Sequence, residues 1–399
     1  MKITAIETLR TGEFANVLWV RLHTDRGLIG LGETFYGAEA VEAHIHNTLA
    51  ARLLGKDATR IEALNRAMVD LPMAQSSTGV EYRAASAVDI ALWDLFGKLT
   101  GQPVHNLLGG LNCDRLRIYN TCAGYGYVRS NNIRPVDTWN IGSAEGPFED
   151  LGAFMTDAGA LAESLLESGI TAMKIWPFDP PAQENRGMSI NAAEMRRALD
   201  PFEKIRKRVG DRMDIMVEMH SLWNLPTAQK IARAIEPYDP CWFEDPIRMN
   251  SPQALEEFAQ STHVPVCASE TLGSRFPYKE MLDRGATQIA MVDLCWTGGL
   301  TEGRKIAALA DSVHKPFAPH DCTGPVGFVA AIHASFSQPN TLIQETVRAF
   351  YTGWYKDLVT ELPVIRDGHA LPMEGPGLGT DLLPAVFERS DLTVRRTEA

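Results

Sequence analysis

The chain lacks the features of a membrane, secreted or nucleic-acid-binding protein. No apolar run reaches the roughly 18 residues that a membrane-spanning helix needs, and the alternating, charged segment 1–7 does not resemble a signal peptide. Positive charge is also in deficit, with 38 Lys and Arg against 50 Asp and Glu. We therefore expect neither a membrane nor nucleic acid as a partner, although a bound metal ion could still attract an anionic substrate.

Cysteine is scarce, and no two cysteines form a Cys-x-x-Cys pair. The six cysteines are scattered through apolar or strand-like stretches. This pattern indicates reduced, mostly buried thiols and predicts a cytoplasmic protein.

The 399 residues are enough for a barrel and a smaller partner domain, and the 45% apolar and 22% charged content is ordinary for a globular protein. Residues 17–24 and 28–33 predict an antiparallel hairpin, and residues 39–71 predict helices. The clearest helix is expected over residues 83–99, where one apolar stripe ends at Gly101.

The pattern changes at about residue 114, where short apolar runs begin to alternate with amphipathic segments. Eight such runs, most followed by a helix-like segment, predict a closed parallel barrel. Two long segments, 124–147 and 177–190, follow the first two strands and are candidate lids. The expected strands cover residues 116–121, 171–175, 214–217, 241–243, 264–268, 287–292, 315–318 and 341–343.

Three evenly spaced glutamates, Glu218, Glu244 and Glu270, end the third, fourth and fifth expected strands. Strand ends converge at a barrel mouth, where three carboxylates repel strongly unless a cation lies among them. Carboxylate oxygens suit Mg²⁺, so we predict one Mg²⁺ there. The alternative, three unrelated acids each paired with a surface cation, fits the even spacing poorly.

The next three strands also end in chemically useful residues. Asp293 and His320 end the sixth and seventh strands, and a carboxylate that accepts one imidazole N–H makes the other nitrogen more basic. We predict this pair as the general base, the alternative for His320 being a structural histidine. Glu345 ends the eighth strand and could, if protonated, donate to a developing oxyanion.

Two further groups are expected on the other side of the ring. Lys174, in the second strand, could steady the carboxylate of a small-molecule substrate. His220 stands two residues after Glu218, so strand alternation would place both side chains on one face. His220 would then be a second acid or base opposite His320, or a partner that orients Glu218.

These residues resemble the enolase superfamily and, within it, the mandelate racemase/muconate lactonizing enzyme family. Two stretches carry the resemblance: 87–94 with its continuation to Gly110, and Met216 to Pro246. The resemblance implies an α/β fold with a modified (β/α)7β TIM-like barrel at 114–371. It also implies an α+β capping domain at 1–113, completed by the tail 372–399, and a homo-oligomer between dimer and octamer. A Lys or His base acting with Mg²⁺ on a carboxylate substrate, through an enediolate, is the superfamily's general pattern and not a result of the spacing.

Two departures narrow the subclass. Glu218 stands where the family usually has Asp, and Trp176 stands where a racemase would have the second lysine of Lys-x-Lys. The ligand-x-His pattern of Glu218 and His220 resembles the galactonate- and mannonate-type sugar acid dehydratases. This implies removal of the α-proton of an aldonate or uronate-derived acid and loss of its 3-hydroxyl, giving a 2-keto-3-deoxy sugar acid.

Two alternatives stay open at this point. A cycloisomerase of a lactone or anhydro sugar acid would use the same residues and the same enediolate, and a non-catalytic enolase-fold protein would bind or regulate. Loops 11–40, 73–80 and 124–147 are expected to choose the substrate. The residues expected to line its site are Phe14, Phe35, Tyr36, Ser76, Ser77, Tyr125 and Trp176.

Overall fold

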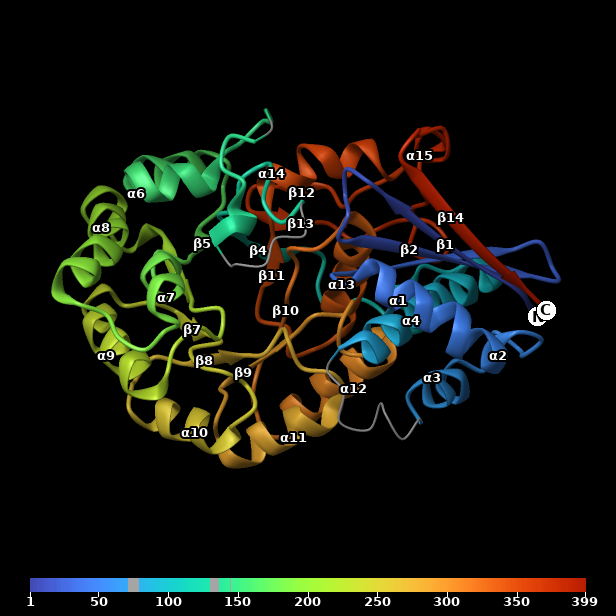
Figure 1. Cartoon of the computed structure of the whole chain (residues 1–399), viewed down its shortest axis with the longest axis horizontal. Helices are drawn as coiled ribbons and strands as arrows, with labels where there is room; N and C mark the ends of the chain where they lie inside the picture. The colour runs from blue at the N-terminus through green and yellow to red at the C-terminus, as the bar shows by residue number, and fades with distance from the viewer. Residues whose placement is uncertain (71–78, 130–135, 144) are drawn as a thin grey trace.

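The computed structural model describes residues 1–70, 79–129, 136–143 and 145–399. An N-terminal unit built on a small antiparallel sheet lies against a larger barrel of parallel strands and surrounding helices (Figure 1). Within the described residues, no helix is both long and apolar enough to cross a membrane.

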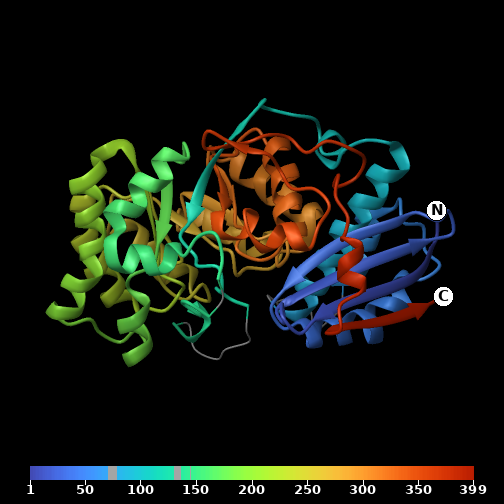
Figure 2. The same ribbon diagram turned by 90° about the horizontal axis from the view of Figure 1, so that it is seen from above.

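The sheet of the N-terminal unit contains both ends of the chain. Its order is β14-β1-β2-β3, formed by Leu392–Glu398, Ile3–Thr11, Val17–Thr24 and Ile29–Phe35. Figure 2 shows β14 along the open edge of β1, with the two termini close together. The last segment of the chain therefore stabilises the sheet that the first segment begins.

One long helix, α4 (Val80–Thr100), covers this sheet and matches the helix expected over 83–99. Gly101 ends it with φ 67°, a left-handed conformation that favours glycine. The contact with β3 is close because Gly32 has no side chain. A Cβ atom at Gly32 would lie 1.9 Å from the carbonyl oxygen of Ala87, so any larger residue would push helix and strand apart.

Eight parallel strands form the barrel, and β11 pairs with β4 to join its last and first strands. Backbone bonds such as Leu342 N–H to the Phe317 oxygen (2.8 Å) link β10 to the segment before β11. The strands are β4 (Leu116–Thr121), β5 (Ala172–Ile175), β6 (Asp214–Glu218), β7 (Trp242–Glu244), β8 (Val266–Ala268), β9 (Ile289–Val292), β10 (Phe317–Pro319) and β11 (Gln344–Thr346).

A long helix follows each of the first seven strands, so the predicted (β/α)7β barrel with a capping unit is confirmed. These helices are α6 (Asp150–Glu167), α8 (Ala192–Val209), α9 (Leu225–Ile235), α10 (Pro252–Gln260), α11 (Arg275–Arg284), α12 (Gly299–Asp311) and α13 (Pro325–Ser337).

Two expectations about this region were wrong. The eighth strand begins at Gln344 and not at 341, because Thr341 and Leu342 are engaged with Phe317 of β10 before the ladder with β4 starts. The segment 177–190 is not only a loop, because it contains the helix α7 (Asp179–Asn185).

The lower part of the barrel interior is filled by side chains from all eight strands or their flanking residues. Because these side chains are buried, the barrel is closed below the carboxyl ends of its strands, and only that end can hold a substrate. The interior group is Tyr119, Ala172, Met216, Trp242, Cys267, Ile289, Met291, Ala318 and Ile343.

Buried carboxylates join the capping unit to the barrel. Asp89 of α4 accepts a hydrogen bond from the backbone N–H of Thr301, in the first turn of α12 (2.9 Å). Glu33 of β3 accepts one from the backbone N–H of Gly327, in the first turn of α13 (2.8 Å). Both carboxylates satisfy free N–H groups at a helix start, where negative charge is favourable. The capping unit is therefore held in a fixed position over the barrel mouth.

The remaining elements are short. They are α1 (Ala38–His44), the π-helix η1 (Ile45–Leu49), α2 (Ala50–Leu53), α3 (Ile61–Val69), α5 (Val104–Leu107), η2 (Val136–Trp139), η3 (Gly210–Arg212), η4 (Glu236–Tyr238), α14 (Arg348–Tyr351), η5 (Trp354–Asp357), β12 (Ile365–Arg366), β13 (His369–Ala370) and α15 (Pro384–Phe387).

Candidate active site

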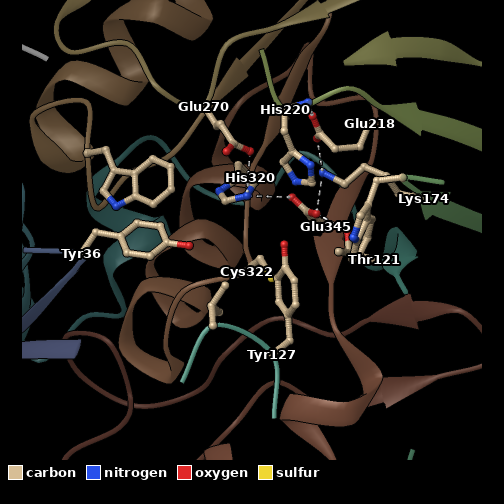
Figure 3. Close-up of a pocket in the computed structure, with 13 residues that line it drawn as sticks. Tyr36, Thr121, Tyr127, Lys174, Glu218, His220, Glu270, His320, Cys322 and Glu345 are labelled. Atoms are coloured by element: carbon tan, nitrogen blue, oxygen red, sulfur yellow. Dashed lines mark hydrogen bonds and ion pairs between the residues drawn. The ribbon is translucent and has the colours of Figure 1, made fainter. Parts of the chain in front are cut away.

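A cavity of about 450 Å³ lies at the carboxyl ends of the barrel strands. The barrel supplies its charged groups, and the capping unit contributes Tyr36 to one wall. The hydroxyl groups of Tyr36 and Tyr127 point toward the centre of the cavity (Figure 3). Acidic, basic and aromatic side chains thus surround one space at the barrel mouth, which is open to solvent.

The three predicted glutamates lie together. Glu218 and Glu244 end β6 and β7, and Glu270 follows β8 by two residues; one carboxylate oxygen from each lies within 4.8 Å of the others. The buried Oε2 atom of Glu218 has no hydrogen-bond partner. A set of converging carboxylate oxygens, one of them buried without a hydrogen bond, fits a hard divalent cation with oxygen ligands.

Lys174 of β5 is the ammonium group among these acids. Its Nζ lies 2.9 Å from Oε1 of Glu345 and 3.4 Å from Oε2 of Glu218, and it donates a short hydrogen bond to Glu244. Burial alone would lower the pKa of Lys174, but the charges of Glu244 and Glu345 outweigh burial and raise it well above its usual value. Lys174 is therefore a fixed positive charge in the site.

His320 and Asp293 form the expected pair, just after β10 and β9. Nδ1 of His320 lies 2.7 Å from Oδ2 of Asp293, and Nε2 lies 2.9 Å from Oε2 of Glu270. Burial would lower the pKa of His320, but the charges of Glu270 and Glu345 and the bond to Asp293 raise it well above its ordinary value. The Asp293 contact leaves Nε2 as the nitrogen available for proton transfer.

His220 also lines the cavity, but not through strand alternation. β6 ends at Glu218, and His220 follows in a left-handed conformation with φ 47°. Its backbone N–H donates to Oε1 of Glu218 at 2.6 Å, so the turn folds back on that carboxylate. The two side chains do line one cavity as expected; the cause is this turn.

A second carboxylate–imidazole pair, not expected from the sequence, forms at His220. Its Nδ1 lies 2.8 Å from Oδ2 of Asp179, a buried residue at the start of α7. Burial would lower the pKa of His220, but Asp179 and Glu218 raise it to about 10. The sequence held one indication of this pair, because Asp179 is an acid that stands shortly after the second strand. Its segment resembles a loop because of Pro177, Pro180 and Pro181.

Glu345, in β11, is fixed on both carboxylate oxygens. Thr121 donates to one, and the backbone N–H of Asp321 donates to the other at 2.9 Å. Burial would raise the pKa of Glu345, but Lys174 and His320 bring it below its usual value. This direction is opposite to the one that the protonated acid expected from the sequence would need, and Oε1 of Glu345 lies 2.9 Å from Nζ of Lys174.

The expected lining residues divide into two groups. Trp176 and Tyr36 line the cavity, and the Trp176 ring lies 5.8 Å from the His220 ring. Phe14 and Tyr125 do not line it, because their rings pack on the guanidinium of Arg129 at 5.1 and 4.4 Å.

Phe35 is also absent from the cavity wall, and Ser76 and Ser77 lie outside the described residues. Several other residues line the cavity although the sequence did not predict them, and most of these stand in loops after barrel strands. They are Thr121, Tyr127, Val128, Trp296 and Cys322. All six cysteines are free, as expected.

Comparison with known proteins agrees with this geometry. Residues 3–109 match the N-terminal domain of mandelate racemase/muconate lactonizing enzymes, and residues 157–386 match the enolase C-terminal domain-like family. A D-galactonate dehydratase from Ralstonia nicotianae is 29% identical over 98% of this chain and 94% of its own length. A D-galactonate dehydratase from Pectobacterium atrosepticum is equally similar, with the same coverage.

Solved structures show similarity to the same group of proteins. An enolase of the mandelate racemase subgroup from Agrobacterium tumefaciens is 46% identical and superposes with a TM-score of 0.89, covering 100% of this chain and 99% of its own. An enolase protein from the Sargasso Sea environmental genome is 41% identical, with the same TM-score and coverage. The chain therefore belongs to the mandelate racemase/muconate lactonizing enzyme family of the enolase superfamily.

Proposed function

We propose that this protein is a Mg²⁺-dependent dehydratase of a sugar acid, an aldonate or a uronate-derived acid. The observation that carries the proposal is the pair of imidazoles, His320 and His220, each bonded to its own buried carboxylate and both lining the cavity that Glu218 and Glu270 of the glutamate group also line. Similarity to proteins named D-galactonate dehydratase supports the same class of reaction.

Glu218, Glu244 and Glu270 would hold the Mg²⁺. When bound, Mg²⁺ supplies positive charge next to the substrate carboxylate, which makes the α-proton more acidic. Bound positive charge would also offset the effect of Glu270 on His320, whose imidazole must be neutral to accept a proton.

His320 is the proposed base. Nε2 takes the proton from the α-carbon, while Asp293 holds the Nδ1–H and steadies the imidazolium that forms. Negative charge then develops on the substrate carboxylate oxygens, and Lys174 supplies fixed positive charge close to them. Glu345 keeps Lys174 in place through its 2.9 Å contact.

His220 is the proposed acid. Its imidazolium gives a proton to the 3-hydroxyl, which departs as water, and the resulting enol becomes a 2-keto-3-deoxy sugar acid by losing its O–H proton and taking up a proton at C3. Asp179, 2.8 Å from Nδ1, stabilises the imidazolium that must be present before the reaction. A racemase would need a base at position 176, where the indole of Trp176 can neither accept nor deliver a proton.

A screen of sugar acids with Mg²⁺ tests the proposal, with 2-keto-3-deoxy products detected as semicarbazones. We expect product from the wild-type protein and none from His320→Asn. A product with the mass of its substrate would indicate a cycloisomerase instead. No turnover, together with no calorimetric binding of Mg²⁺, would indicate a non-catalytic protein.

A further inference from the structure

Arg83 places a guanidinium beside the active-site cavity from the capping unit. It stands in the first turn of α4, and its side chain is half-buried. Its Cζ lies 5.2 Å from the centroid of the Trp296 ring, and Trp296 lines the cavity. A barrel residue thus carries the guanidinium on its aromatic face, which fixes the cation at the junction of the two units.

This guanidinium lacks the partners that a half-buried arginine normally has. Its Nε is buried and has no hydrogen-bond partner, and no ion pair or side-chain hydrogen bond joins the Arg83 guanidinium to any residue that the structure describes. Arg304 is a useful contrast: it lies 5.7 Å from the Trp93 ring and its Nε is also buried without a partner, but its guanidinium pairs with Glu62. A buried N–H without an acceptor is unfavourable, and a carboxylate is the acceptor that fits the paired N–H groups of a guanidinium.

The other cations of the site already have anionic partners. Lys174 contacts Glu244 and Glu345, and His220 contacts Asp179. In the proposed reaction these groups act at the reacting end of the substrate. Arg83 is different, because no carboxylate in the described part of the chain forms an ion pair with it, and its charge acts on Trp296, Asp293 and Tyr36 only through space.

The shape of the cavity shows where the far end of a substrate must go. Below the reacting groups the barrel is filled by buried side chains such as Tyr119 and Trp242. On the capping side, the Trp296 ring lies 5.4 Å from His320 and 5.7 Å from the Tyr36 ring. A chain whose α-carbon lies at His320 can therefore extend along Trp296 toward the capping unit, and Arg83 lies on that ring, just outside the residues that line the cavity.

We propose that Arg83 binds a second carboxylate at the far end of the substrate, so that the preferred substrate is a sugar diacid, an aldarate, and not the matching aldonate. This inference rests on the proposed function and narrows it to the uronate-derived acids. The Tyr36 and Tyr127 hydroxyls, which point into the cavity, would face the hydroxyl groups of the chain between the two carboxylates.

Matched pairs of acids test the inference: galactarate against galactonate, and glucarate against gluconate, each with Mg²⁺. We expect kcat/KM to favour the diacid of at least one pair. In Arg83→Gln that preference should fall by about 10- to 100-fold, the usual weight of a hydrogen-bonded charge pair, mainly through KM. Arg83→Lys should restore part of the preference for the diacid. Arg304 is the matched arginine that also lies on an indole, and Arg304→Gln should keep the full preference.

Failure of this inference can be told apart from failure of the proposed function. Turnover of aldonates equal to or faster than that of aldarates, or an unchanged preference in Arg83→Gln, overturns the role of Arg83 while leaving the dehydratase intact. If no acid of either class is dehydrated, the proposed function fails. Calorimetric binding of galactarate and galactonate in Mg²⁺ then still decides the role of Arg83, because equal affinity for the two contradicts it.

Discussion

Nδ1 of His220 lies 2.8 Å from Oδ2 of Asp179, and this contact fixes which nitrogen of the imidazole is free to face the cavity. The arrangement repeats, on another side of the site, the 2.7 Å contact between His320 and Asp293. Two histidines that each contact a buried carboxylate can still have opposite roles, one accepting a proton and the other donating one. In our account His320 must start neutral and His220 must start protonated.

Asp179→Asn should slow dehydration about 100-fold while changing KM little. The amide keeps the shape of the carboxylate but removes the charge that holds the His220 proton, and the loss of an orienting partner commonly costs 10- to 100-fold. Steady-state kinetics, with its pH profile, measures this. The control is Asp200→Asn, a surface acid paired with Lys204. Equal effects of the two substitutions on kcat would exclude a role for Asp179 in the reaction.

Glu270→Gln should weaken Mg²⁺ binding by about 10-fold or more, because one charged ligand of three is replaced by a neutral one. The three carboxylate oxygens lie within 4.8 Å of one another, so each should contribute to the same ion. Isothermal titration calorimetry gives the affinity, and Glu256→Gln on the outer helix α10 serves as the control. Wild-type affinity in Glu270→Gln would place the metal elsewhere.

His333 should make the fold less stable in acid. It is fully buried, its Nδ1 accepts from the backbone N–H of His105 and its Nε2 donates to the Leu378 oxygen, each at 3.1 Å. Burial lowers its pKa to about 3. As pH falls below the unfolded value of about 6.5, only the unfolded chain takes up the proton, so His333 removes about 2 kcal/mol of stability by pH 5.

The measurement compares His333→Gln with the wild type. Urea unfolding at pH 7 and at pH 5 gives the free energy lost on acidification for each protein. We expect the variant to lose about 2 kcal/mol less than the wild type between these pH values, even if it is less stable at both. An equal loss in the two proteins would show that His333 is not the group that takes up this proton.

The barrel and most of its chemistry could be predicted because they depend on local patterns. Each strand is a short apolar run, and the acids that end β6 and β7 follow their runs directly. Once parallel strands close into a barrel, their ends must meet, so the grouping of Glu218, Glu244 and Glu270 follows from topology alone.

What could not be predicted depends on contacts between distant segments. Asp179 reaches His220 because residues that read as a loop form α7, and no periodicity connects these two positions. Phe14 and Tyr125 are aromatic residues of the kind that often line a binding site, yet both pack on Arg129. The role of Asp89 was also hidden, since its partner Thr301 lies in another unit of the fold.

Hydrogen exchange in D₂O shows whether His320 takes the α-proton and His220 expels the hydroxyl. A sugar acid that the wild type dehydrates is incubated with Mg²⁺ and either His220→Asn or His320→Asn, and mass spectrometry follows deuterium at the α-carbon and loss of water. We expect His220→Asn to exchange the α-hydrogen without losing water and His320→Asn to do neither. Near-normal α-exchange in His320→Asn would contradict these roles.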